Sequence, residues 1–148
     1  MTLAARWRVR KRPYIIFSMS KNASGHIKPT EFELELLRLL WTREGATIRD
    51  LHGMVSRYRK LGYTTVLKTM QIMYDKGLVV REEVGKAHLY RASQTEEETR
   101  HQLLGDLSER LFGGSAGQLV LHALAADEVT AQELKQIKAV ISQKERQK

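Results

Sequence analysis

The chain has 148 residues, 42% of them hydrophobic, so it can form one compact domain or two small ones with an apolar core. It has no cysteine, which excludes disulfides, thiolate metal sites and cysteine nucleophiles and fits a reducing, cytoplasmic location. The formal net charge of +8 suggests an anionic partner. No segment approaches the about 18 consecutive apolar residues that a membrane span needs, so we expect no membrane insertion.

The positive charge is unevenly distributed along the chain. Residues 1–28 contain seven Lys/Arg and no acid, which predicts a basic, flexible tail. Two interpretations of this segment stay open: an arm that contacts DNA phosphates, or a translation start assigned upstream of Met19. Residues 49–91 carry nine basic and four acidic side chains, a net of +5, whereas residues 96–133 carry two and eight, a net of −6. Only the first of these two stretches is suited to a polyanion.

The first two predicted helices begin at threonine capping boxes. In "PTEFELELLRLLW", Thr30 is the expected N-cap and Glu33 follows three residues later. The stretch "ATIRDLHGMVSRYRK" repeats this signature with Thr47 and Asp50. The second helix is expected to continue through that whole stretch, with Tyr58 in its apolar stripe, until "LG" at 61–62 breaks the chain.

A third helix and a hairpin follow. The helix is predicted over "GYTTVLKTMQIMYDKG" and ends at Gly77 in a left-handed cap. The period then changes from 3.6 to 2, because "LVVREEV" and "HLYRA" read as two strands joined at Gly85-Lys86. Three helices and a two-stranded hairpin over residues 29–92 are the order of a winged helix-turn-helix domain.

Residues 93–148 predict three more helices, the first starting at Ser93 or Thr95 and the last at a capping box of Thr130 and Glu133. Such short helices bury too little surface to be stable alone, so we predict a helical dimerisation region that pairs with an identical copy. The chain is therefore expected to be mostly α with a small β-hairpin. The predicted dimer interface consists of Leu103, Leu107, Leu111, Phe112, Leu119, Val120, Leu124, Leu134, Ile137 and Ile141.

The third helix carries the candidate chemistry. At 100° per residue, its apolar positions fall on one side and hydroxyl, amide and ammonium groups fall on the other. Gln pairs with adenine, Lys donates to guanine, and Thr bonds a base edge or contacts the thymine methyl. The predicted base-reading residues are Thr64, Thr65, Lys68 and Gln71. The predicted phosphate contacts are Arg57, Arg59 and Lys60 before the turn, and Arg81 and Lys86 on the hairpin.

No catalytic site, cofactor or metal is expected. The five His residues form no HExxH motif, and Glu97 and His101 are better read as a solvated pair than as metal ligands. Asp106 and Glu109 are read as exposed acids of an amphipathic helix. The alternative to DNA binding is a winged helix used only for protein–protein contact.

Four segments resemble the penicillinase-repressor family of bacterial transcription regulators: "PTEFELELLRLLW", "YTTVLKTMQIMYDKGLVVRE", "GKAHLYRA" and "LFGGSAGQLVLHAL". The similarity covers about residues 28–143. It implies an N-terminal winged helix, a C-terminal dimerisation region, and a homodimer that blocks transcription from an inverted-repeat operator in double-stranded DNA until a signal removes it.

The chain departs from the family pattern at three points. Copper-responsive relatives carry a C-terminal cysteine cluster, which is missing here and excludes that route of copper sensing. The resemblance also implies a membrane sensor protease system as a partner, but the Asn-Phe cleavage site of the β-lactam-responsive repressors matches His122-Ala123, so the same cleavage rule is not expected. Many members have Arg in place of Ile72, so an operator sequence is not transferred.

Overall fold

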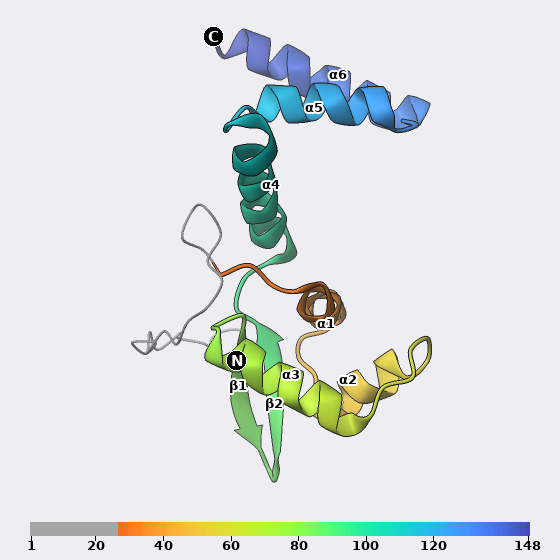
Figure 1. Ribbon diagram of the computed structural model, residues 1–148, viewed down its shortest axis with the longest axis vertical. Helices are drawn as coiled ribbons and strands as arrows, with labels where there is room; N and C mark the ends of the chain where they lie inside the picture. Colours follow the sequence, from red (N-terminus) through yellow and green to blue (C-terminus); the bar gives the residue numbers. More distant parts are fainter. Residues whose placement is uncertain (1–26) are drawn as a thin grey trace, which may run out of the picture. The chain divides into compact units, whose positions relative to one another are not determined.

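The computed structural model describes residues 27–148, so the predicted basic tail lies almost wholly outside the described residues. The described chain is mostly helical with one antiparallel hairpin (Figure 1), which confirms the predicted fold class. Within it, no helix is long and apolar enough to cross a membrane. The elements are α1 (Glu31–Trp41), α2 (Ile48–Val55), α3 (Tyr63–Asp75), β1 (Val79–Val84), β2 (Ala87–Ala92), α4 (Glu96–Phe112), α5 (Ala116–Ala126) and α6 (Ala131–Arg146).

The chain divides into two compact units, the first ending at Leu103 and the second running from Leu104 to Lys148. This division lies inside α4, later than the boundary predicted after residue 92. One contact inside the first unit holds the segment before α4, because the Trp41 indole Nε1 donates to the Gln94 carbonyl at 2.9 Å. The predicted functional division into residues 29–92 and 93–148 stays a prediction.

The predicted capping boxes are present. Thr30 Oγ1 accepts from the Glu33 amide at 3.2 Å, and the Glu33 carboxylate accepts from the Thr30 amide at 2.9 Å. The same reciprocal bonds start three more helices, at Thr47–Asp50, Thr95–Glu98 and Thr130–Glu133. At α2, the hydrogen bonds from the Thr47 amide and hydroxyl lower the pKa of Asp50. This cap therefore contributes fully above the ordinary Asp pKa and is lost as the pH falls through the lowered value.

The second helix is shorter than predicted. It ends at Val55, because the amides of Arg57 and Tyr58 bond three residues back, to Met54 O at 3.3 Å and Val55 O at 3.2 Å, in place of continuing the helical pattern. The His52 ring then donates from Nε2 to Leu61 O at 2.9 Å and fixes the connection to α3. The expected continuation of the helix through residues 56–60 was therefore wrong.

The hairpin is joined to the helices by a backbone bridge that no sequence pattern predicted. Ala46 exchanges two hydrogen bonds with Tyr90 of β2, at 3.0 and 2.8 Å, and so acts as a one-residue third strand. Gly45 makes this approach possible, because its φ is +149° and a Cβ there would lie 3.0 Å from Leu89 Cγ. The predicted tip is confirmed: β1 and β2 are linked by Gly85-Lys86, and Gly85 has φ +63°.

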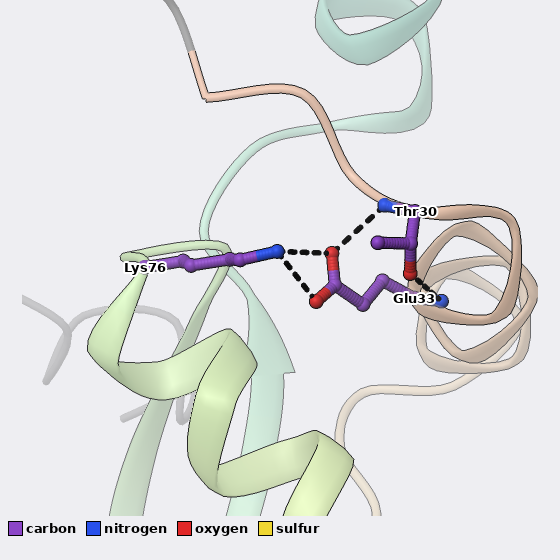
Figure 2. A network of polar contacts seen from close by, with 3 residues as sticks. All are labelled: Thr30, Glu33 and Lys76. Carbon is purple, nitrogen blue, oxygen red and sulfur yellow. Dashed lines mark hydrogen bonds and ion pairs between the residues drawn. The ribbon is translucent and has the colours of Figure 1, made fainter. Parts of the chain in front are cut away.

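A largely buried ion pair joins the start of α1 to the end of α3 (Figure 2). Lys76 Nζ donates to both carboxylate oxygens of Glu33, at 2.7 and 3.0 Å, across 43 residues of sequence. The Glu33 side chain is only 4% exposed, and the same carboxylate caps α1 through Thr30. Most of the hydrogen-bonding capacity of this buried carboxylate is thus used.

The buried apolar core lies in the first unit. Its members come from α1, α2, α3, both strands and the connection between α1 and α2, and they are Leu36, Leu37, Leu40, Ala46, Ile48, Leu51, Val55, Val66, Met70, Met73, Val79 and Tyr90. Among residues 104–148, no apolar side chain belongs to this core. In the second unit, Gly113 and Gly114 have positive φ and follow the end of α4, and the centres of the Phe112 and His122 rings lie 4.9 Å apart.

Replacing Lys76 tests the buried ion pair. Lys76→Met keeps the apolar stem but leaves the Glu33 charge without its cation, and we expect a loss of about 2–3 kcal/mol in the free energy of unfolding, measured in urea. Adding Glu33→Gln should recover part of this loss, because no unpaired charge then remains buried. The exposed control Lys60→Met should change stability by less than about 0.5 kcal/mol. Equal stability of the Lys76→Met and Lys60→Met proteins would contradict a structural role for the pair.

Two glycine substitutions test the bridge. Gly45→Ala places a Cβ against Leu89 at a positive φ and should destabilise the protein by about 1–3 kcal/mol. Gly53→Ala, in α2 with no atom within 4 Å of the new Cβ, should stabilise it by about 0.5–1 kcal/mol. Thermal unfolding followed by circular dichroism compares the two. A Gly45→Ala protein that is as stable as the wild type, or more stable, would refute the close approach at Gly45.

Candidate nucleic-acid interface

α3 is fixed in the first unit by its apolar side. Val66, Met70 and Met73 are fully buried, at 0% exposure, and the helix packs against α2 and β1. Its end is the left-handed glycine cap that the sequence predicted, because Gly77 has φ +78° and the next amide, of Leu78, bonds back to Met73 O at 2.9 Å. This anchoring determines which side chains of α3 point outward.

The outward side of α3 carries all four predicted base-reading residues: Thr64, Thr65, Lys68 and Gln71. We call this set the reading face; each member is exposed. The Lys68 and Gln71 side chains make no hydrogen bond or ion pair within residues 27–148, so their donors and acceptors are available to a ligand. The arrangement supplies hydroxyl, ammonium and amide groups on about two turns of a rigid helix, which is the set that major-groove recognition uses.

The N-terminus of α3 differs from the other helix starts in the described chain. Gly62 is its N-cap, no side chain caps it, and its first turn has no acid. The other described helices start with a Thr or Ser side-chain cap. The free N–H groups and the positive end of the helix dipole therefore leave the N-terminus of α3 favourable to an anion.

The predicted phosphate contacts before α3 lie in the turn that follows α2. Arg57 and Lys60 are exposed there. Arg59 is partly committed within the protein, because its Nη1 lies 2.8 Å from Glu35 Oε2 and its guanidinium lies over the Phe32 ring at 5.1 Å. Of these three cations, Arg59 is thus the least available to a ligand.

The hairpin, which we call the wing, lies beside α3 (Figure 1). Lys86 is exposed at its tip, next to Gly85. Arg81 is exposed but held, because its guanidinium lies 4.0 Å from the centre of the Tyr74 ring on α3. Glu82 and Glu83 are also exposed on β1, so the strand offers one cation beside two acids. The wing is therefore a weaker attractor of anions than Arg81 and Lys86 alone predict.

Three exposed side chains, one in the turn before α3 and two on α3 itself, were not among the predicted contacts. Tyr58, expected in an apolar stripe, is 59% exposed because α2 ends before it. Partial desolvation and the nearby Glu35 carboxylate raise the pKa of Tyr58, so its hydroxyl remains a donor at neutral pH. Tyr63 and Ile72 of α3 are about half exposed. The sequence signal available for Ile72 was its position on the polar side of the helix, four residues after Lys68.

The predicted dimer-interface residues are accessible in the single chain. Leu107, Leu111, Val120, Leu134 and Ile141 are all exposed, and Leu111 is the most so at 65%. The remaining predicted members, Leu103, Phe112, Leu119, Leu124 and Ile137, are half-buried. Apart from Leu103, these residues lie in a unit that adds nothing to the buried apolar core.

Residues 27–148 include no group of three or more His, Asp and Glu side chains placed to hold a metal ion. Asp106 differs from expectation, because it is buried at 2% exposure and its carboxylate lies 3.2 Å from Arg110 Nε. Glu109, its neighbour one turn on, is exposed as expected. An arginine-paired carboxylate is a structural arrangement rather than a general acid.

The fold and the reading face define a winged helix-turn-helix protein. Residues 29–143 match the family model described as "Penicillinase repressor". The chain is 31% identical over 106 residues to "Transcriptional regulator BlaI" of Mycobacterium tuberculosis, in strains CDC 1551 / Oshkosh and H37Rv, covering 68% of this chain and 77% of the relative. It is 15% identical over 120 residues to "Penicillinase repressor" of Staphylococcus aureus, covering 81% and 95%.

The chain therefore belongs to the penicillinase repressor family. This membership indicates a transcriptional repressor and not an enzyme.

Proposed function

We propose that the chain represses transcription as a homodimer that binds an inverted-repeat DNA operator. The observation that carries the proposal is the reading face of α3. One side of this helix is held in the core by fully buried side chains, and the Lys68 and Gln71 side chains on the other side are exposed and form no bond within residues 27–148. Each copy inserts α3 into a major groove, and the two grooves lie about one helical turn, ~34 Å, apart. The bound dimer obstructs polymerase.

Phosphate contacts hold this complex in register. The uncapped N-terminus of α3, with Arg57 and Lys60 in the preceding turn, supplies the positive charge closest to the reading face. Lys86, at the tip of the wing, contacts a phosphate of the DNA backbone. Arg59 and Arg81 contribute less, because Glu35 and Tyr74 already engage their guanidinium groups.

The dimer forms through the second unit. Its leucines Leu107, Leu111 and Leu134 stay exposed, and no apolar partner among residues 27–148 buries them. Contiguous exposed apolar side chains are typical of interaction sites, and an identical copy is the commonest partner of a soluble chain. The second unit would then set the distance between the two reading faces.

A winged helix that contacts only protein is the competing function. It predicts no salt-dependent affinity for duplex DNA, whereas the uncommitted cations around α3 favour a polyanion. Transcription resumes when a signal releases the repressor from the operator. A membrane sensor protease system is one source, but His122 and Ala123 lie within helical backbone of α5, so cleavage there would first require local unfolding.

Fluorescence anisotropy with duplexes selected from a random 30-base-pair library tests base reading. Lys68→Ala and Gln71→Ala should each lower the preference for the selected duplex over a scrambled one by about 1–3 kcal/mol, because each variant removes a base contact. Lys86→Ala should weaken binding to both duplexes alike and reduce the salt slope by about one. Lys148→Ala, at the exposed C-terminus, is the matched control. Wild-type preference in both α3 variants would show that these residues do not read bases.

Sedimentation equilibrium at micromolar concentration tests the dimer. We expect a mass of about 34 kDa, twice the 17.0 kDa of the chain. Leu111→Glu should shift the protein to monomer without unfolding it, because this side chain is already 65% exposed in the single chain. The exposed control Gln136→Glu should remain dimeric. A wild-type protein that stays monomeric would refute the proposed assembly.

A further inference from the structure

Ile72 is an apolar side chain in the middle of a polar surface. It is 49% exposed, whereas Val66, Met70 and Met73 of the same helix are fully buried and Leu67 is half-buried. Four residues separate Ile72 from Lys68, which places the two side chains about 40° apart around the helix axis. Isolated exposed apolar residues are common on protein surfaces, so the position of Ile72, not its exposure, carries the argument.

The position of Ile72 matches the dimensions of a base-reading surface. From Thr64 to Ile72 the helix rises about 12 Å, roughly the length of three to four base pairs. Gln71 precedes Ile72 in the chain and is exposed, and Asp75 is exposed one turn further on. Polar neighbours on this side leave an apolar patch of a single side chain, which is too small to dock a protein partner.

We propose that Ile72 is a specificity-determining residue that contacts the C5-methyl group of a thymine in each half-site. This inference rests on the proposed function, because it requires the reading face to enter the major groove. The thymine methyl is the apolar group that the unmodified major groove presents. Elsewhere in the groove, Ile72 would cover donors and acceptors of the bases without replacing their hydrogen bonds to water. Both effects select thymine at the same position.

The test removes only the methyl group. Full-length protein is used to select a duplex from the random library, and each thymine of that duplex is then replaced singly by uracil, which keeps base pairing. We expect one thymine in each half-site at which uracil raises the Kd by about three- to fivefold, the value of one buried methyl group. Replacing both should raise the Kd by roughly the square of that factor.

Two variants assign the effect to Ile72. Ile72→Ala should bind the thymine and uracil duplexes equally, and it should fold normally, because the side chain is half exposed and Ala favours a helix. Lys68→Ala is the matched control on the same side of α3: it should bind more weakly while keeping the three- to fivefold uracil effect.

The outcomes separate this inference from the proposed function. Sequence-specific binding without any uracil-sensitive position, or with the same sensitivity in Ile72→Ala, overturns the role of Ile72 and leaves DNA binding intact. Absence of duplex binding by the wild-type protein overturns both. A uracil effect that disappears only in Ile72→Ala supports the methyl contact.

Discussion

The buried pair of Glu33 and Lys76 is the constraint on which the candidate interface depends. One carboxylate caps the start of α1 and receives the ammonium group at the end of α3, so the two helix ends are tied by charge-assisted hydrogen bonds of 2.7–3.0 Å. Apolar packing of Val66, Met70 and Met73 is non-directional and would tolerate a shift of α3 along its own axis. The ion pair joins specific atoms and opposes such a shift, so the side chains of the reading face keep a defined position.

Fewer cations of the first unit are available to an anionic ligand than its net charge suggests. Two of the five predicted phosphate-contact cations are engaged inside the protein, Arg59 by Glu35 and Phe32, and Arg81 by Tyr74. These two side chains hold neighbouring elements together and add less to the attraction of an anionic ligand. Apart from Lys86 at the wing tip, the cations that remain available, Lys68, Arg57 and Lys60, lie on α3 and in the turn before it. On the proposal that the ligand is duplex DNA, it would be drawn toward α3 rather than toward the wing.

Features that depend on neighbouring residues could be predicted from the sequence, and contacts between residues far apart in the chain could not. Thr-x-x-Glu/Asp spacing located three helix starts, at Thr30, Thr47 and Thr130, and Gly77 was correctly assigned to a left-handed cap. The Ala46–Tyr90 bridge and the Lys76–Glu33 pair each join residues far apart in the chain, so no local pattern contains them. The early end of α2 was missed although it is local, because the apolar period continues to Tyr58 while the backbone turns after Val55. The exposed side of α3 followed from its 3.6-residue period, whereas the engagement of Arg59 and Arg81 needed the positions of α1 and Tyr74.

The restriction of the buried apolar core to the first unit has a consequence for gene dosage. A chain without a partner keeps this core and its reading face, because neither depends on residues 104–148. On the proposal that an operator needs two copies, a single chain would be a folded but weak binder. Below the dissociation constant of the dimer, operator occupancy would then fall with the square of the amount of protein in the cell. Transcription of the target genes would therefore respond to a modest drop in repressor supply more steeply than in proportion.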